Sequence, residues 1–195
     1  MKIAVLASGN GSNFEALANA VGNGEIPAKI DLLFSDHQDA YVLKRAEKFQ
    51  IPSESFELKE FENKAAYEDA LLNLLKKNQI DLVILAGYMR IVGEKLLQAF
   101  PKRIINIHPA LLPSFPGLHG IKDAFEAGVA ETGVTVHYVD SGVDTGPVIA
   151  QEKVIIDKND TLEILEEKIH AVEHGLYPAV IAKIIKELGH ETCAD

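Results

Sequence analysis

The chain has 195 residues and a formal net charge of -10, with 47% hydrophobic and 25% charged residues. This is ordinary soluble composition, and the length favours a single domain over residues 1–195. The acidic balance argues against a nucleic-acid surface. Because no apolar run reaches membrane-spanning length and MKIAVLA is not followed by a small-residue cleavage site, we expect a cytoplasmic protein. The single cysteine, Cys193, excludes an internal disulfide and a cysteine-based metal site.

Strand and helix signals alternate along the chain. Short continuous apolar runs predict strands at residues 3–7, 30–34, 81–86 and 103–107. Apolar residues at helical spacing predict helices at residues 14–21, 40–50, 62–78 and 121–128. This order predicts an α/β fold, in which a mostly parallel sheet has helices on both faces.

The last third of the chain departs from this alternation. An alternating segment from residue 133 and a strand-like run at 148–156 flank the short loop DSGVDTG, which predicts an antiparallel hairpin closing the sheet. A final helix is predicted to begin at Asp160 with Glu163 as its capping partner. Pro178 should kink or restart this helix, and Gly189 should end it.

The stretch RIINIHPALLPSFPGLHG at residues 103–120 is the most informative of the chain. Asn106 and His108 lie two positions apart on a predicted strand, so their side chains point to the same face. Several prolines and Gly117 make the following loop stiff. An amide donor beside an imidazole on a braced backbone suits acyl-group chemistry, although a strand-end turn pair would look the same in sequence.

A glycine loop, GNGSN, follows the first predicted strand and precedes a helix. It lacks the third glycine of a dinucleotide fingerprint and the lysine of a Walker loop. Free backbone N–H groups at a helix N-terminus favour one phosphate, and we predict that this loop binds one. The alternative is that Ser12 and Glu15 form a capping box and bind no ligand.

The hairpin loop contributes two acids, Asp140 and Asp144. If the hairpin packs beside the strand of Asn106, Asp144 would face His108 and favour the charged imidazole. Asp144-Thr145-Gly146 also resembles the aspartic-protease triplet, but that chemistry needs two such loops in an all-β frame, so we set it aside.

The last helix contains His170-Ala171-Val172-Glu173-His174, which fits the H-x-x-E-H zinc-peptidase pattern. A zinc site of this kind needs a third ligand downstream. Two other interpretations stay open: a solvated helix face, and a pocket rim at which His170 and Glu173 hold sugar hydroxyls.

Six motifs together resemble the phosphoribosylglycinamide formyltransferases of purine synthesis: GNGSN, AGYMR, NIHPALLP, FPGLHG, VHYVDSGVDTGPVI and VEHGLYP. The similarity runs in register from Met1 to about Ile185. It implies a Rossmann-like formyltransferase fold and transfer of a formyl group from the co-substrate 10-formyltetrahydrofolate to the glycinamide amine of a ribonucleotide. It implies small-molecule partners and no metal, nucleic acid or membrane, and it leaves a homodimer open.

The resemblance also implies roles for individual residues. The catalytic residues would be Asn106, His108 and Asp144. The ribotide and its phosphate would contact Gly11, Ser12, Asn13, His170 and Glu173. The folate would contact Lys64, Met89, Arg90, Ile91, Val92, Asn106, Asp140, Ser141, Gly142, Val143 and Asp144, with Arg90 helping to bind the glutamate carboxylates.

This chain departs from the pattern at two positions. Ala110 stands where many relatives have Ser, and His170 where some have Gln, which makes Glu173 the firmer ribotide contact. The expected mechanism is direct transfer, because no Ser or Cys nucleophile stands beside the site. Asn106 and protonated His108 would stabilise the oxyanion, and Asp144 would keep His108 charged. The zinc peptidase and a non-catalytic sugar-phosphate binder remain alternatives.

Overall fold

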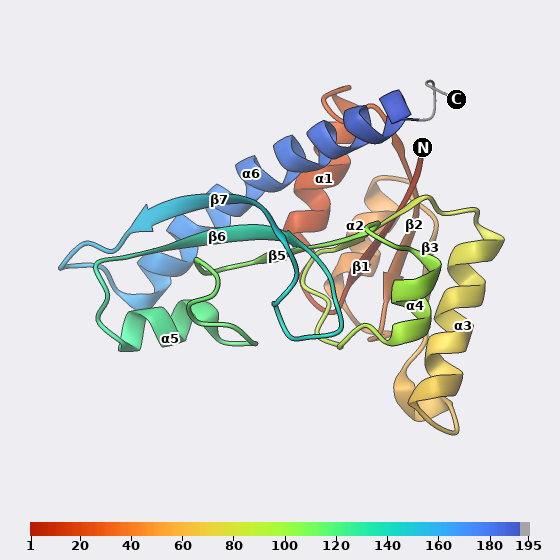
Figure 1. The fold of residues 1–195 in the computed structure, drawn as a ribbon, viewed down its shortest axis with the longest axis horizontal. Coiled ribbons are helices and arrows are strands. Elements are labelled where there is room, and N and C mark those ends of the chain that lie inside the picture. The colour runs from red at the N-terminus through yellow and green to blue at the C-terminus, as the bar shows by residue number, and fades with distance from the viewer. Residues whose placement is uncertain (192–195) are drawn as a thin grey trace.

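The computed structural model describes the backbone of residues 1–191 and side chains as far as Gly189. A seven-stranded sheet with the order β3-β2-β1-β4-β5-β6-β7 forms its centre (Figure 1). The strands are β1 (Lys2–Ala7), β2 (Lys29–Ser35), β3 (Ser53–Ser55), β4 (Leu82–Leu85), β5 (Ile104–His108), β6 (Glu131–Tyr138) and β7 (Val148–Ile155). The first five strands pair in parallel, whereas β6 pairs antiparallel with both β5 and β7. The predicted parallel sheet with an antiparallel hairpin is therefore confirmed.

Helices cover both faces of this sheet. They are α1 (Ser12–Gly22), α2 (Tyr41–Lys48), α3 (Lys64–Lys77), α4 (Glu94–Ala99), α5 (Gly120–Glu126) and α6 (Leu162–Glu191), with a 3-10 turn η1 (Leu58–Glu60). One buried cluster joins the sheet to α1, α2 and α6, and a second joins it to α3 and α4. Successive residues of β1 alternate between the clusters, since Val5 belongs to the first and Leu6 to the second.

Besides the 3-10 turn η1, the sequence patterns missed one strand and one helix. Strand β3 has only three residues, SES, and lies at the edge of the sheet, so it carries no apolar signal. Helix α4 has six residues, too few for the helical period to repeat.

Helix α6 differs from its prediction at three points. It begins at Leu162, where the Thr161 hydroxyl accepts the Ile164 N–H at 3.3 Å, so the predicted start at Asp160 with Glu163 as partner is wrong. It is one continuous helix through Pro178 and past Gly189, so a restart at Pro178 and an end at Gly189 are wrong, whereas a kink at Pro178 stays a prediction.

Tertiary contacts explain why α6 tolerates a proline. The fully buried Tyr177 donates its hydroxyl to the backbone oxygens of Leu85 at 2.7 Å and Ile105 at 3.2 Å. Pro178 is itself buried, so this stretch of the helix is held against the sheet. Packing therefore outweighs the local preference for a break.

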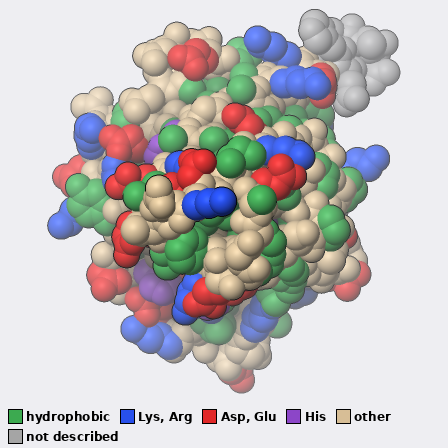
Figure 2. Space-filling model, turned by 90° about the vertical axis from the view of Figure 1, so that its left-hand side faces the viewer, with side chains coloured by type: hydrophobic (Ala, Val, Ile, Leu, Met, Phe, Trp, Pro, Cys, Tyr) green, Lys and Arg blue, Asp and Glu red, His purple; other side chains and the backbone are tan. Residues whose placement is uncertain are grey.

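The surface carries mixed charge. Acidic and basic side chains are interspersed on the face that Figure 2 shows, rather than gathered into a single basic area. Within residues 1–191, none of the helices has both the length and the apolar character needed to cross a bilayer. Cys193, the subject of the disulfide prediction, lies outside the described residues.

Candidate active site

A cavity of about 690 Å³ opens where β1, β4 and β5 end. Its walls come from the glycine loop, the loop after β4, the loop after β6 and helix α6. Most predicted site residues line it: Gly11, Ser12, Asn13, Met89, Arg90, Ile91, Val92, Asn106, His108, Asp140, Gly142, Val143, Asp144, His170 and Glu173. This is the sheet edge at which ligands collect in open α/β folds.

Two predicted residues do not line this cavity. Ser141 lies in the exposed hairpin loop. Lys64 is the first residue of α3 and lines a neighbouring cavity of about 320 Å³, where its ammonium lies 3.7 Å from a carboxylate oxygen of Glu68. Arg90 lines both cavities and therefore lies between them.

Asn106 and His108 lie on β5 and face the cavity together. The register pairs Asn106 with His137 and His108 with Thr135 on β6. Their side-chain contacts reach β6 and the proline loop rather than neighbouring residues of a turn. Strand periodicity accounts for their shared direction.

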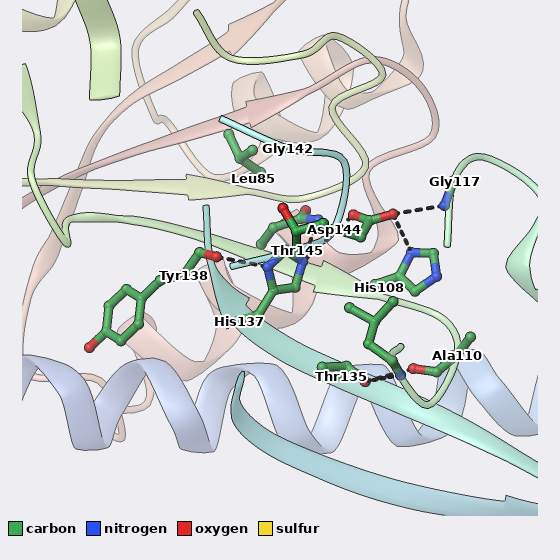
Figure 3. Close-up of polar contacts among 12 residues, drawn as sticks. Leu85, His108, Ala110, Gly117, Thr135, His137, Tyr138, Gly142, Asp144 and Thr145 are labelled. Carbon is green, nitrogen blue, oxygen red and sulfur yellow. Dashed lines mark hydrogen bonds and ion pairs between the residues drawn. The ribbon is translucent and has the colours of Figure 1, made fainter. Parts of the chain in front are cut away.

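Asp144 joins these groups from the hairpin loop (Figure 3). Its Oδ2 accepts the Gly117 N–H at 2.8 Å and lies 3.5 Å from His108 Nδ1, while Oδ1 lies 3.7 Å from His137 Nε2. Burial alone would raise the pKa of Asp144. The Gly117 N–H hydrogen bond and the charge of His108 outweigh burial and lower the pKa below its usual value, so the group is a carboxylate at neutral pH.

The His108 ring is held by the loop that follows its strand. It is only 3% exposed, and its Nε2 donates to the Phe115 carbonyl oxygen at 2.7 Å. A Cβ on Gly120 would lie 3.0 Å from that nitrogen, so a larger residue at this position would crowd the ring. At 3.5 Å, the His108 Nδ1 contact with Asp144 is longer than a hydrogen bond, which leaves Nδ1 open to a ligand atom.

The proline loop is braced from β6. The Thr135 hydroxyl donates to the Ala110 carbonyl at 2.7 Å and accepts the Leu112 N–H at 3.1 Å. Gln151 on β7 donates to both the Thr135 hydroxyl and the Leu112 carbonyl, at 2.9 Å each. These bonds fix the loop that carries the acceptor of His108.

His137 is the site residue that the sequence patterns missed. It is 2% exposed, and Asn106 Nδ2 lies 3.2 Å from its Nε2. Its Nδ1 donates to the Tyr138 carbonyl oxygen at 2.8 Å (Figure 3). With that proton on Nδ1, the neutral ring presents Nε2 as an acceptor, so His137 orients the Asn106 amide.

The glycine loop leads into α1 without a side-chain cap. Gly11, the N-cap, has φ 80°, and no side chain caps the helix, so the predicted Ser12–Glu15 capping box is absent. Glu15 instead pairs with Arg45 and Lys48. The first N–H groups of α1 are thus not occupied by a capping side chain, as an anion site requires.

Glu173 and His170 on α6 also line this cavity, while His174 lines a different one against α1. Glu173 is 5% exposed and accepts a hydrogen bond from Asn13 Nδ2 at 3.3 Å, so the interpretation as a solvated helix face is wrong for Glu173, whereas His170 is exposed. Within the described part of the chain, no group of three or more His, Cys, Asp or Glu side chains is arranged to hold a metal ion.

Burial raises the pKa of Glu173 to about 7, against an opposing effect of the Asn13 hydrogen bond. Because this folded-state pKa lies above the unfolded value, stability should be lost as the pH rises from about 4.5 to 7 and stay level above. We expect Glu173→Gln to remove this loss. Between pH 5 and 8, the free energy of unfolding should fall on the order of 1 to 3 kcal/mol more in the wild type than in the variant.

Urea unfolding at the two pH values measures this difference. Other titrating groups are common to both proteins and cancel in the comparison. Parallel pH profiles for the wild type and Glu173→Gln would contradict the assignment of a raised pKa to Glu173.

The site therefore combines an oriented amide, an imidazole beside a carboxylate, and a helix N-terminus suited to a phosphate. An amide and an imidazole can stabilise negative charge that develops on a carbonyl oxygen. The carboxylate can hold a proton on the imidazole. These groups suit transfer of an acyl group to or from a phosphate-bearing molecule.

Comparison with known proteins agrees with this chemistry. A family model described as "Formyl transferase" matches residues 1–181, so the chain belongs to the formyl transferase family. The "Phosphoribosylglycinamide formyltransferase" of Bacillus subtilis (strain 168) is 52% identical over 184 residues, which cover 94% of each chain. The crystal structure of phosphoribosylglycinamide formyltransferase from Streptococcus pneumoniae TIGR4 is 56% identical, covers 94% of this chain and 98% of its own, and has a TM-score of 0.89.

A third relative, the "Trifunctional purine biosynthetic protein adenosine-3" of Drosophila pseudoobscura pseudoobscura, is 43% identical over 183 residues. These cover 93% of this chain and 13% of that protein. The predicted resemblance and fold class are thus confirmed, and the protein is a formyltransferase. Membership of this family decides against the zinc peptidase.

Proposed function

We propose that the protein transfers the formyl group of 10-formyltetrahydrofolate to the glycinamide amine of 5'-phosphoribosylglycinamide, a step of purine (IMP) biosynthesis in the cytoplasm. The observation that carries this proposal is the convergence of Asn106, His108 and Asp144 in one cavity with the glycine loop. The names of the close relatives support the choice of acceptor.

In this proposal the two substrates lie along the cavity. The phosphate occupies the N-terminus of α1 at Gly11, Ser12 and Asn13, and Glu173 with His170 contacts the ribose. The folate lies against the backbone of residues 89–92 and the hairpin loop 140–144. Lys64, beyond the cavity wall, faces the outer end of the folate.

The transfer is direct. The substrate amine attacks the formyl carbon, and a new carbon–nitrogen bond forms. A second N–H of Asn106 and the Nδ1 proton of His108 stabilise the oxyanion. The negative charge of Asp144 keeps His108 protonated. The bond from the formyl carbon to folate N10 breaks, and the amine proton reaches N10 through water.

One assay tests the proposal. Purified protein is mixed with 10-formyltetrahydrofolate and glycinamide ribonucleotide, and the absorbance of the folate is followed as tetrahydrofolate forms. We expect formation that depends on both substrates. Binding of the ribonucleotide without any turnover would instead indicate a non-catalytic sugar-phosphate binder.

Variants of the glycine loop test where the phosphate binds. We expect Ser12→Ala and Asn13→Ala to raise KM for the ribonucleotide by roughly 10- to 100-fold, the loss of a hydrogen bond to a charged group. KM for the folate should change much less. Ser53→Ala, on the exposed edge strand β3, serves as the control and should change neither constant. A larger increase in KM for the folate than in KM for the ribonucleotide would indicate that the phosphate binds elsewhere.

A further inference from the structure

Arg45 on α2 is a partly buried arginine to which neither the sequence motifs nor the proposed function assigns a role. Its side chain is 19% exposed. Nε donates to the backbone carbonyl of Asn10 at 2.8 Å, and one terminal nitrogen donates to the Asn10 side-chain oxygen, also at 2.8 Å. The other terminal nitrogen pairs with Glu15 in the first turn of α1. All three guanidinium nitrogens therefore bind the glycine loop or the start of the helix that follows it.

The first turn of α2 contacts the glycine loop at two further points. The Val42 N–H donates to the Gly9 carbonyl at 3.1 Å. A Cβ on Gly11 would collide with the Val42 side chain, so the loop packs closely against this helix. Asn10 lies between the two glycines, and its hydrogen bonds with Arg45 complete the contact through which α2 holds the loop.

A guanidinium suits this position better than an ammonium. Its planar fork presents several donors at fixed angles, so it can bind both oxygens of Asn10 and the Glu15 carboxylate at once. The Tyr41 ring supports it, with its centre 5.0 Å from the guanidinium carbon. Lys48 shares the carboxylate, since its Nζ lies 2.9 Å from Glu15 Oε1. The negative charge of Glu15 is thus paired with two cations rather than left to repel a phosphate one turn away.

We propose that Arg45 is a positioning residue for the phosphate: by fixing Asn10, it holds the glycine loop so that the first N–H groups of α1 face the bound phosphate. This inference rests on the proposed function, in which Gly11, Ser12 and Asn13 bind the phosphate of the ribonucleotide. Arg45 does not line the cavity, so it acts through the loop and not by touching the ligand. A loop that is ordered before the ligand arrives loses less binding energy to ordering.

The test compares two formyl acceptors, glycinamide ribonucleotide and the corresponding ribonucleoside, which lacks the phosphate. Arg45→Met removes the guanidinium and keeps an unbranched side chain. We expect kcat/KM for the ribonucleotide to fall about 10- to 100-fold, mainly through KM, because hydrogen bonds of a charged group are lost. The value for the ribonucleoside and KM for the folate should not change, because neither depends on the phosphate site. General damage to the fold would affect all of them.

Two variants separate the geometry of Arg45 from its charge. Arg45→Lys keeps the charge without the fork, and we expect a loss of about 3- to 10-fold for the ribonucleotide. Asn10→Ala removes one of the two acceptors, and we expect a loss of about the same size. Added to Arg45→Met, it should cause no further loss, because the two residues act through one contact.

Lys44→Met is the matched control. It removes the same charge from the same helix, on an exposed side chain whose ammonium also lies beside the Tyr41 ring, at 5.9 Å from its centre. We expect kcat/KM for both acceptors and KM for the folate to stay at their wild-type values. Melting temperatures are measured for every variant.

Two results would overturn the inference while leaving the proposed function in place. An equal loss for the ribonucleotide and the folate in Arg45→Met would show that Arg45 supports the fold in general. Full recovery of Arg45→Met on addition of Glu15→Gln would show that Arg45 only neutralises Glu15 and does not position the loop. A wild-type protein that transfers no formyl group would contradict the proposed function and this inference together, whereas an active wild type with an unchanged KM for the ribonucleotide in Arg45→Met would contradict this inference alone.

Discussion

Replacement of His108 by alanine should lower kcat by about 100- to 10000-fold, the range lost with a positioned acid or base. The ring is nearly enclosed, with Nε2 bonded to the Phe115 carbonyl and Nδ1 turned toward Asp144. Both neighbours are acceptors, so the surroundings suit a ring that carries its protons and donates one to the developing oxyanion. Alanine removes that donor and leaves the Asp144 carboxylate facing an empty space.

The measurement is single-turnover formyl transfer with both substrates saturating. Circular dichroism and the affinity for the ribonucleotide should be retained, because His108 is not among the residues proposed to bind the phosphate. His119→Ala is a matched control, since this exposed histidine precedes α5 without a side-chain capping bond and does not line the cavity. Turnover near the wild-type rate in His108→Ala would remove the residue from the mechanism.

The central part of the site could be predicted from local sequence. Asn106 and His108 lie two residues apart on a strand, and strand geometry alone puts them on one face. Asp144 could be added because a short loop between two strands predicted the hairpin, and the hairpin returns the acid to the same sheet edge. Each step relied on strand periodicity or on a turn, and a few neighbouring residues are enough to determine either one.

Residues whose role depends on distant partners could not be found in this way. The alternation of β6, which put Val134 and Val136 on one face, also puts His137 on the other. Its position opposite Asn106 follows only from the register between β5 and β6, which no short stretch of sequence encodes. The contacts of the buried Asp36 carboxylate are even harder to predict from local sequence. Its hydrogen-bond partners Ser8 and Arg90 are 28 and 54 residues away in the chain.

Local sequence signals also gave a wrong prediction where distant packing or a ligand site determines the structure. The spacing of Ser12 and Glu15 fits a capping box, yet Glu15 turns to Arg45 and Lys48 on α2. Gly11 explains the difference: it adopts φ 80°, and a Cβ there would collide with the Val42 side chain. The chain therefore enters α1 with no side-chain cap, which lowers local helix stability but suits the proposed phosphate site.

Replacement of Asn106 by alanine should lower kcat by about 100- to 1000-fold, as expected for one lost oxyanion donor. Its amide nitrogen carries two N–H groups. One is directed at His137 Nε2 at 3.2 Å, and the other is available to an oxygen in the cavity. KM for either substrate should change little, because the proposed interaction strengthens only as charge develops in the transition state.

Three further variants separate the donor from the volume it fills. Asn106→Leu keeps the bulk of the side chain without the donors, so it should lose as much activity as alanine. His137→Phe leaves the amide in place but unoriented, and we expect a smaller loss, on the order of 10-fold. Asn73→Ala, on the exposed face of α3, is the control and should retain full turnover. An active Asn106→Leu would show that Asn106 fills space, and formyl transfer would then need its oxyanion donor from another group in the cavity.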